Sequence, residues 1–161
     1  MVKKISPNRK VYELLNKKTI IMRLKKTSKE DAIKQLIDCL PAGETDERIR
    51  NDILSAIKKR ESIESTGIGN GIAIPHAKLN TIKNFYVILA LSKEGIDFNA
   101  TDKKPVYIIF LVLSKEQDKV LYIRILARLA RLLHNNEFRI GLTKKETPEE
   151  VINFIKKYES F

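Results

Sequence analysis

The sequence predicts an α/β domain in which a β-sheet is covered by helices. Apolar residues recur at helical spacing before, between and after the segments that favour strands. Two uninterrupted apolar runs, Phe85–Leu91 and Val106–Leu113, are short and rich in β-branched residues, as central strands are. A length of 161 residues with 43% hydrophobic content matches one folded domain with a substantial core.

The N-terminal segment is strongly basic. Residues 1–26 contain nine Lys or Arg and one Glu, so they carry +8 of the net charge of +11. Such a segment could attract nucleic acid, anionic lipid or an acidic protein. It lacks the interleaved aromatic residues of a base-stacking surface, so a solvated basic face is the simpler interpretation and nucleic-acid binding the alternative. We expect residues 1–10 to form a basic N-terminal arm and residues 11–161 to form the domain.

A short strand and a helix are predicted to follow the arm. The strand is Thr19–Leu24, an apolar run with β-branched residues. The helix begins at a capping box formed by Thr27 and Glu30. Its apolar stripe, which precedes the stop signals Pro41 and Gly43, comprises Ala32, Ile33, Leu36, Ile37 and Leu40.

A second helix and a glycine-rich loop come next. The helix begins near Thr45 or Asp46 and ends before Ser62. Its buried face comprises Ile49, Ile53, Leu54 and Ile57. The loop contains three alternate glycines and leads into the segment Ile72–His76.

The second half of the chain alternates between strand and helix patterns. Turns at Glu94–Gly95 and Asp102–Lys103 lie between the two central strands. From Asp118 the period is helical again, and His134 lies near the end of this helix. A last helix begins at residues 147–150, where Thr is the N-cap, Pro occupies N1 and Glu occupies N3.

Several functional classes are unsupported by the composition. No apolar run approaches the roughly 20 residues that cross a bilayer, and the first residues lack the apolar stretch of a secretory signal. Cys39 is the single cysteine, so no internal disulfide can form. We therefore expect a cytoplasmic protein without membrane insertion.

The stretch from Gly67 to His76 carries the most chemical information. Three alternate glycines allow close approach to the main chain, and Pro75 restricts the backbone beside the imidazole. The residues alone leave open whether His76 is catalytic or structural. No second His, Cys or paired carboxylate lies at metal-ligand spacing, and the glycines match neither a dinucleotide nor a P-loop fingerprint. Neither a metal nor a cofactor is expected.

The motif GIGNGIAIPHA, which ends at His76 and Ala77, resembles the active-site signature of type-2 IIA domains of the bacterial sugar phosphotransferase system. These domains comprise the fructose, mannitol and nitrogen-regulatory class. The pairs Arg60-Glu61 and Ser65-Thr66, together with Lys78, resemble the nitrogen-regulatory branch in particular. The resemblance covers roughly residues 10–158.

This resemblance implies a mixed sheet flanked by helices and a phosphorylated histidine at position 76. His76 would accept a phosphoryl group from the carrier HPr or its nitrogen-branch counterpart. Phosphoryl transfer depends mainly on alignment and charge stabilisation, so donors around the phosphate matter. Expected donors are Arg60, which could instead be a solvated charge at a helix end, and the phosphate-binding set Ser65, Thr66, Gly67, Gly69 and Gly71.

One position departs from the family pattern. Members carry a second histidine beside the phosphorylated one, near the start of the helix that here begins around Asp118, and Tyr122 aligns with it. We expect Tyr122 to approach His76 from that helix and His76 to be accessible at the sheet edge. A phenol cannot become a cation, so onward transfer is expected to be weakened. Two roles remain open: relay of phosphate through a IIB domain towards a sugar permease, and regulation of a target by phosphorylation state.

Overall fold

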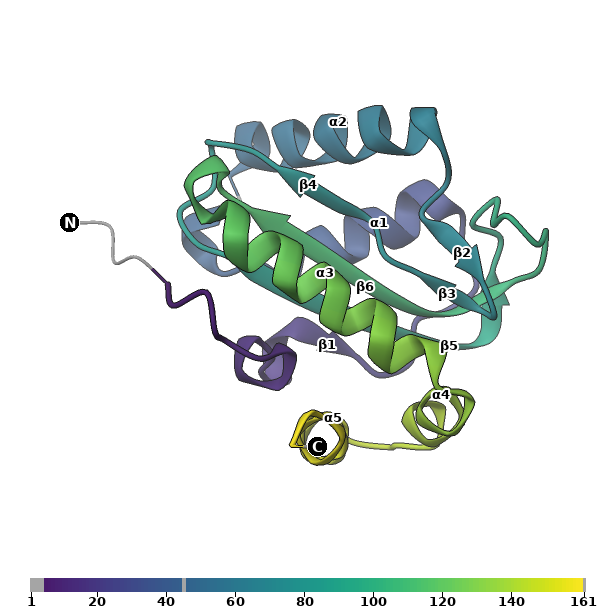
Figure 1. Cartoon of the computed structure of the whole chain (residues 1–161). Helices are drawn as coiled ribbons and strands as arrows, with labels where there is room; N and C mark the ends of the chain where they lie inside the picture. Colours follow the sequence, from purple (N-terminus) through teal and green to yellow (C-terminus); the bar gives the residue numbers. More distant parts are fainter. Residues whose placement is uncertain (1–4, 45, 161) are drawn as a thin grey trace.

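The computed structural model describes residues 5–44 and 46–160 and contains a mixed six-stranded sheet between two layers of helices (Figure 1). The strands are β1 (Ile20–Ile21), β2 (Gly67–Gly69), β3 (Ile72–Ala73), β4 (His76–Lys78), β5 (Tyr86–Ile96) and β6 (Val106–Ser114). The helices are α1 (Lys29–Ile37), α2 (Glu47–Ile63), α3 (Lys119–His134), α4 (Asn136–Thr143) and α5 (Pro148–Glu159). Short 3-10 helices are η1 (Val11–Leu14), η2 (Lys17–Thr19), η3 (Ala42–Glu44) and η4 (Glu116–Asp118). The predicted fold class is confirmed.

The two long strands form the centre of the sheet, as the apolar runs predicted. Strand order is β1-β5-β6-β3-β2, and β4 also pairs with β6. β5 and β6 are antiparallel, whereas β1 runs parallel to β5, and both β3 and β4 run parallel to β6. Residues 87–92 of β5 and 108–114 of β6 are buried on both faces, which explains the continuous apolar runs in these strands.

Alternate residues of the central strands enter two separate cores. Val87, Leu89 and Leu91 pack on the side of α3, α4 and α5. Ile88 and Ala90 pack on the opposite side with α1 and α2. The sheet therefore separates two hydrophobic cores, each covered by its own helices.

The segment containing β3 and β4 follows one edge of β6 and positions His76. Ile72 lies opposite Ile108, and His76 lies opposite Val112. Between the two strands the carbonyl oxygen of Pro75 accepts a hydrogen bond from Val112 N at 3.0 Å. Ala77 packs into the core with α1 and α2. Because side chains alternate along a strand, His76 points to the face that α3 covers.

The N-terminal elements differ from the predicted ones. The strand expected over residues 19–24 is reduced to Ile20–Ile21, although Leu24 N still donates to Leu91 O at 2.8 Å. The N-cap of α1 is Ser28 instead of Thr27, and its hydroxyl accepts from Asp31 N at 3.1 Å. Asp46 is the N-cap of α2, whereas Thr45 lies outside the described residues.

Three later elements also differ from expectation. α2 continues to Ile63, and the expected glycine loop is the hairpin of β2 and β3. The turn expected at Glu94–Gly95 lies inside β5, where the register shifts between Leu91 and Ile96. α4 was not predicted, because it has only eight residues and shares Asn135 with the end of α3.

The predicted start of the helix near Asp118 and the predicted cap at Thr147 are both confirmed. Asp118 is the N-cap of α3, and His134 is its last helical residue. Thr147 is the N-cap of α5, and its hydroxyl accepts from Glu150 N at 3.2 Å. Pro148 occupies the first helical position, where its missing N–H costs no hydrogen bond.

The described part of the expected arm lies against the helices. Arg124 of α3 donates to Pro7 O at 3.3 Å and to Asn8 Oδ1 at 2.6 Å. Lys10 Nζ donates to the main-chain oxygen of Glu159 at 3.2 Å. Residues 1–4 lie outside the described residues, so a domain boundary at residue 10 stays a prediction. Among the described residues, no helix has the length and apolar character needed to cross a membrane.

The close approach of β2 to the loop before β6 gives a test of stability. A Cβ atom on Gly67 would lie 2.9 Å from both Cα and Cβ of Ala100. We expect Gly67→Ala to lower the free energy of unfolding by about 1–3 kcal/mol, the cost of overpacking, as measured by urea unfolding. Gly43→Ala is the control, because the nearest atom there is the mobile Nζ of Lys83 at 3.7 Å. Equal stabilities of the two variants would contradict this packing argument.

Candidate functional site

The imidazole of His76 is oriented by its own backbone. Nδ1 lies 2.7 Å from the carbonyl oxygen of Ile74. A carbonyl can only accept a hydrogen bond, so this contact assigns the ring proton to Nδ1. In the neutral ring, the lone pair then lies on Nε2, for which the described residues supply no hydrogen-bond donor.

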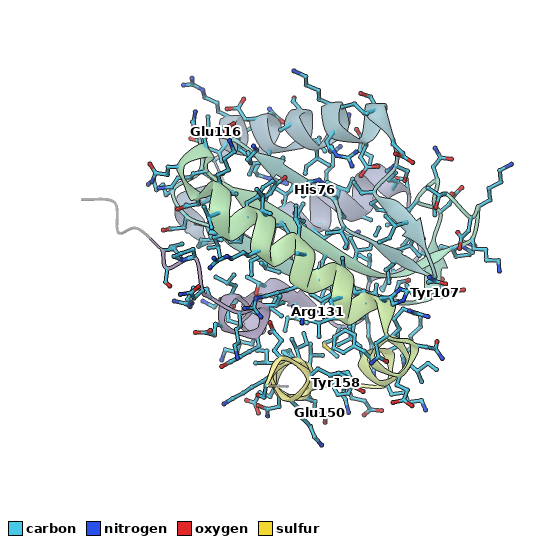
Figure 2. The ribbon with its side chains drawn as sticks, viewed as in Figure 1. His76, Tyr107, Glu116, Arg131, Glu150 and Tyr158 are labelled. Carbon is cyan, nitrogen blue, oxygen red and sulfur yellow. The ribbon has the colours of Figure 1, made fainter. Side chains whose placement is uncertain are left out.

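The surroundings of His76 favour the neutral ring. Burial lowers the pKa of His76 from its usual 6.5, and the positive charge of Arg60 lowers it further. The Ile74 carbonyl and the carboxylate of Glu61 act in the opposite direction and only partly offset this. The ring is half-buried on β4, between α2 and α3 in the view of Figure 2. A neutral, partly accessible imidazole can act as a nucleophile near neutral pH.

Tyr122 lies beside His76, as predicted from its alignment with the second histidine. The two ring centroids are 5.9 Å apart, and the ring planes are inclined by 57°. Tyr122 is only 8% exposed, and burial raises its pKa to about 12. The phenol therefore stays protonated and can donate a hydrogen bond, but it supplies no positive charge.

Arg60 lies at the helix end, as one of its two interpretations predicted, and phosphate binding by its guanidinium stays a prediction. It lies in the last turn of α2, where a guanidinium nitrogen donates to the Glu64 carbonyl oxygen at 2.8 Å. Its charge also lowers the pKa of both His76 and Tyr122. Arg60 therefore caps the helix end while remaining close enough to influence both rings.

The hydroxyl groups of Ser65 and Thr66 are bonded within the protein. Ser65 Oγ donates to Phe98 O at 2.9 Å and accepts from Gly67 N at 3.0 Å. Thr66 donates through both its backbone N–H and its hydroxyl to the carboxylate of Glu61. These bonds connect the segment after α2 to Phe98 and to Glu61 at the end of α2. Phosphate binding by Ser65, Thr66 and Gly67 stays a prediction.

Glu61 was not predicted to have a role, although its carboxylate connects the segment after α2 to α1. Besides Thr66, its carboxylate binds Lys29 Nζ at 2.6 Å, and its side chain is 8% exposed. The bond joins the start of α1 to the end of α2. The available sequence signal was the neighbouring Arg60-Glu61 pair, but nothing in it pointed to Lys29, which is distant in sequence.

Two of the predicted phosphate-binding glycines lie away from His76. The carbonyl oxygen of Gly71 accepts from the backbone N–H groups of Tyr107 and Ile108. His76, in contrast, lies opposite Val112, four residues or about 13 Å farther along β6. Gly69 belongs to the same hairpin end as Gly71. Figure 2 shows Tyr107 near the C-terminal end of α3, opposite the end at which Glu116 lies.

Those glycines have a structural function in the hairpin. Gly71 has φ +77°, and a Cβ atom there would lie 3.0 Å from the ring of Tyr107. Position 71 therefore requires glycine for the turn. The structure does not bring Gly69 and Gly71 together with His76, and any phosphate-binding role for them stays a prediction.

Lys78 and Glu116 complete the surroundings of the two rings. Lys78 Nζ lies 5.7 Å from the ring centroid of Tyr122 and 4.0 Å from Glu116 Oε2. The sequence indicated Lys78 only through the family resemblance and assigned it no role. Among the described residues, no group of three or more His, Cys, Asp and Glu side chains is placed to bind a metal.

Comparison with known proteins adds independent information. Residues 13–158 match the profile of the family described as "Phosphoenolpyruvate-dependent sugar phosphotransferase system, EIIA 2". The chain is 38% identical over 125 residues to a fructose-specific EIIA component from Haloferax volcanii, covering 77% of this chain and 80% of that one. It is 34% identical over 151 residues to a fructose-specific EIIABC component from Bacillus subtilis. That match covers 93% of this chain but only 24% of the Bacillus protein.

A solved structure agrees with the sequence comparisons. The nitrogen regulatory protein IIA-Ntr from Neisseria meningitidis superposes with a TM-score of 0.82 at 26% identity. The match covers 90% of this chain and 98% of the Neisseria chain. Relatives with sugar-specific names and a relative with a nitrogen-regulatory name are thus both similar to this chain. The chain belongs to the type-2 EIIA family of the phosphoenolpyruvate-dependent sugar phosphotransferase system.

Proposed function

We propose that this protein is a phosphocarrier that accepts a phosphoryl group on Nε2 of His76. The observation that carries the proposal is the hydrogen bond from Nδ1 to the Ile74 carbonyl oxygen, because it leaves the Nε2 lone pair free in a neutral ring. Family membership supports a phosphocarrier role in general. HPr or its nitrogen-branch counterpart is the proposed donor, and the cytoplasm the proposed location.

In the proposed reaction, the Nε2 lone pair attacks the phosphorus atom of a phosphohistidine on the donor. The Nε2–P bond forms as the donor N–P bond breaks, and its electron pair stays on the donor nitrogen. Nδ1 keeps its proton, so the phosphorylated ring is positively charged and the Ile74 carbonyl stabilises that charge. Onward transfer returns a neutral imidazole without moving a proton. Both half-reactions are thus reduced largely to alignment and charge stabilisation.

A regulatory use of the phosphorylated state is the second candidate function. Tyr122 favours it, since a neutral phenol beside His76 stabilises the phosphoryl group less strongly during onward transfer than an imidazolium would. The likeness to a nitrogen regulatory protein points the same way. In the first role a IIB domain would be the acceptor. In the second, a regulatory target would bind according to the phosphorylation state of His76.

The first test removes the nucleophile. We expect His76→Ala to abolish acid-labile phosphorylation by phosphoenolpyruvate, enzyme I and HPr, measured by intact mass, while the far-UV circular dichroism spectrum is unchanged. His134→Ala is the matched control, because that side chain lies at the exposed end of α3 and should retain full phosphorylation. Phosphate uptake by His76→Ala would refute the assignment.

A second test uses pH. Because the pKa of His76 is lowered below 6.5, less than half of the ring is protonated at pH 6.5. The rate of phosphoryl acceptance should therefore fall by less than twofold between pH 8 and 6.5 and drop only at lower pH. An NMR titration of the His76 ring, assigned with His76→Ala, measures the midpoint directly. A midpoint above 6.5 would show that burial is not the dominant influence.

A third test concerns the phenol. We expect Tyr122→His to speed onward transfer to a IIB domain about five- to tenfold, because one charge-assisted hydrogen bond gains about 1 kcal/mol over a neutral one. Tyr122→Phe, which keeps the ring and removes the donor, should be slower than the native protein. Both rates are measured by rapid quench from the phosphorylated protein. If Tyr122→His transfers no faster than the native chain, the substitution does not limit transfer.

A further inference from the structure

We propose that Lys78 binds the phosphoryl group on His76 and supplies the positive charge that Tyr122 cannot provide. This inference rests on the proposed function of His76. It adds a residue whose charge, position and present partner each point to the same role.

The strand geometry places Lys78 on the side of the reacting ring. His76 and Lys78 are two residues apart on β4, so their side chains leave the same face of the strand. Both approach Tyr122, since the imidazole lies 5.9 Å and the ammonium 5.7 Å from the centroid of its ring. The phenol ring therefore lies next to both the nucleophile and the ammonium group.

A cation in this position has a chemical purpose. A phosphoryl group on nitrogen carries negative charge on three oxygens, and charge-assisted hydrogen bonds stabilise it more than neutral ones do. Tyr122 contributes only a neutral donor. Arg60 influences His76 but already donates to the Glu64 carbonyl oxygen. Of these two cations, Lys78 has the more distant partner, since its ammonium lies 4.0 Å from Glu116 Oε2.

The present partner of Lys78 is weak enough to be exchanged. Its Nζ lies 4.0 Å from Glu116 Oε2, the limit of an ion-pair contact, and the Glu116 side chain is 56% exposed. Exposed ion pairs of this kind contribute about 0–1 kcal/mol. The Lys78 side chain is 33% exposed, and its four-carbon stem allows the ammonium to move. We infer that Lys78 leaves Glu116 when the phosphoryl group arrives.

Glu116 has a defined place in this exchange. It lies in η4, at the N-terminal end of α3, and Figure 2 shows it at the end of the molecule close to the start of that helix. Its carboxylate neutralises Lys78 before phosphorylation and competes with the phosphoryl group afterwards. Removal of the carboxylate should therefore strengthen phosphoryl binding, whereas removal of the ammonium should weaken it.

The experiment measures the equilibrium of phosphoryl exchange between phosphorylated HPr and the protein. An equilibrium constant is independent of docking rates, so it reports the stability of the phosphorylated site. We expect Lys78→Gln to shift it about five- to tenfold toward HPr, the effect of one charge-assisted hydrogen bond, and Lys78→Arg to restore it to within about twofold. Glu116→Gln should shift it toward the phosphorylated protein.

Lys157→Gln is the matched control. It also removes one positive charge, but from an exposed position on α5, and should leave the equilibrium unchanged. A second readout is the pKa of the phosphoryl oxygens, followed by phosphorus NMR after phosphorylation with potassium phosphoramidate. A nearby ammonium lowers that pKa, so Lys78→Gln should raise it.

The outcomes separate this inference from the proposed function. If the native protein takes up no phosphate on His76, the proposed function itself fails. If it is phosphorylated but Lys78→Gln behaves like Lys157→Gln in both readouts, Lys78 does not bind the phosphoryl group. Should Lys78→Gln fail to fold, Lys78→Arg and Glu116→Gln still decide, because an unchanged equilibrium in Glu116→Gln contradicts the exchange.

Discussion

The hydrogen bond between Nδ1 of His76 and the Ile74 carbonyl oxygen determines the chemistry available at this site, and the sheet keeps that bond in place. The segment from Ile72 to Lys78 runs along β6, where Val112 N bonds the Pro75 carbonyl and His76 pairs with Val112. The backbone at position 74 is therefore fixed by the same ladder that fixes the ring. The edge of β6 therefore fixes the orientation of the His76 ring, with the proton on Nδ1 and the lone pair on Nε2.

A second set of contacts is made by Arg60 and Glu61 at the C-terminal end of α2. Glu61 joins Thr66 to Lys29, while Arg60 bonds the carbonyl of Glu64 and acts electrostatically on both His76 and Tyr122. The end of α2 thus contributes a carboxylate that holds the backbone and a guanidinium that favours the neutral ring. Neighbouring residues on one helical turn have opposite charges and separate functions.

The sequence predicted the parts of this molecule whose signals are local. The apolar runs of β5 and β6, the helix start near Asp118 and the cap at Thr147 were anticipated from such signals. The approach of Tyr122 to His76 was expected from the family resemblance instead. Other features depend on contacts between distant segments, such as the binding of Glu61 by Lys29. The family resemblance suggested phosphate binding by the alternate glycines. The strand register shows that Gly71 lies in a hairpin turn farther along β6 than His76, a position that the sequence did not reveal.

The edge position of β4 also bears on how the chain avoids unwanted self-association. Open strand edges can recruit strands from other molecules, and proteins resist this with short edges, prolines and charged side chains. β4 has three residues, pairs only with β6 among the described strands, follows Pro75 and ends at Lys78, while α2 packs against it. His76 therefore lies at a sheet margin whose backbone offers a poor template for intermolecular β-pairing.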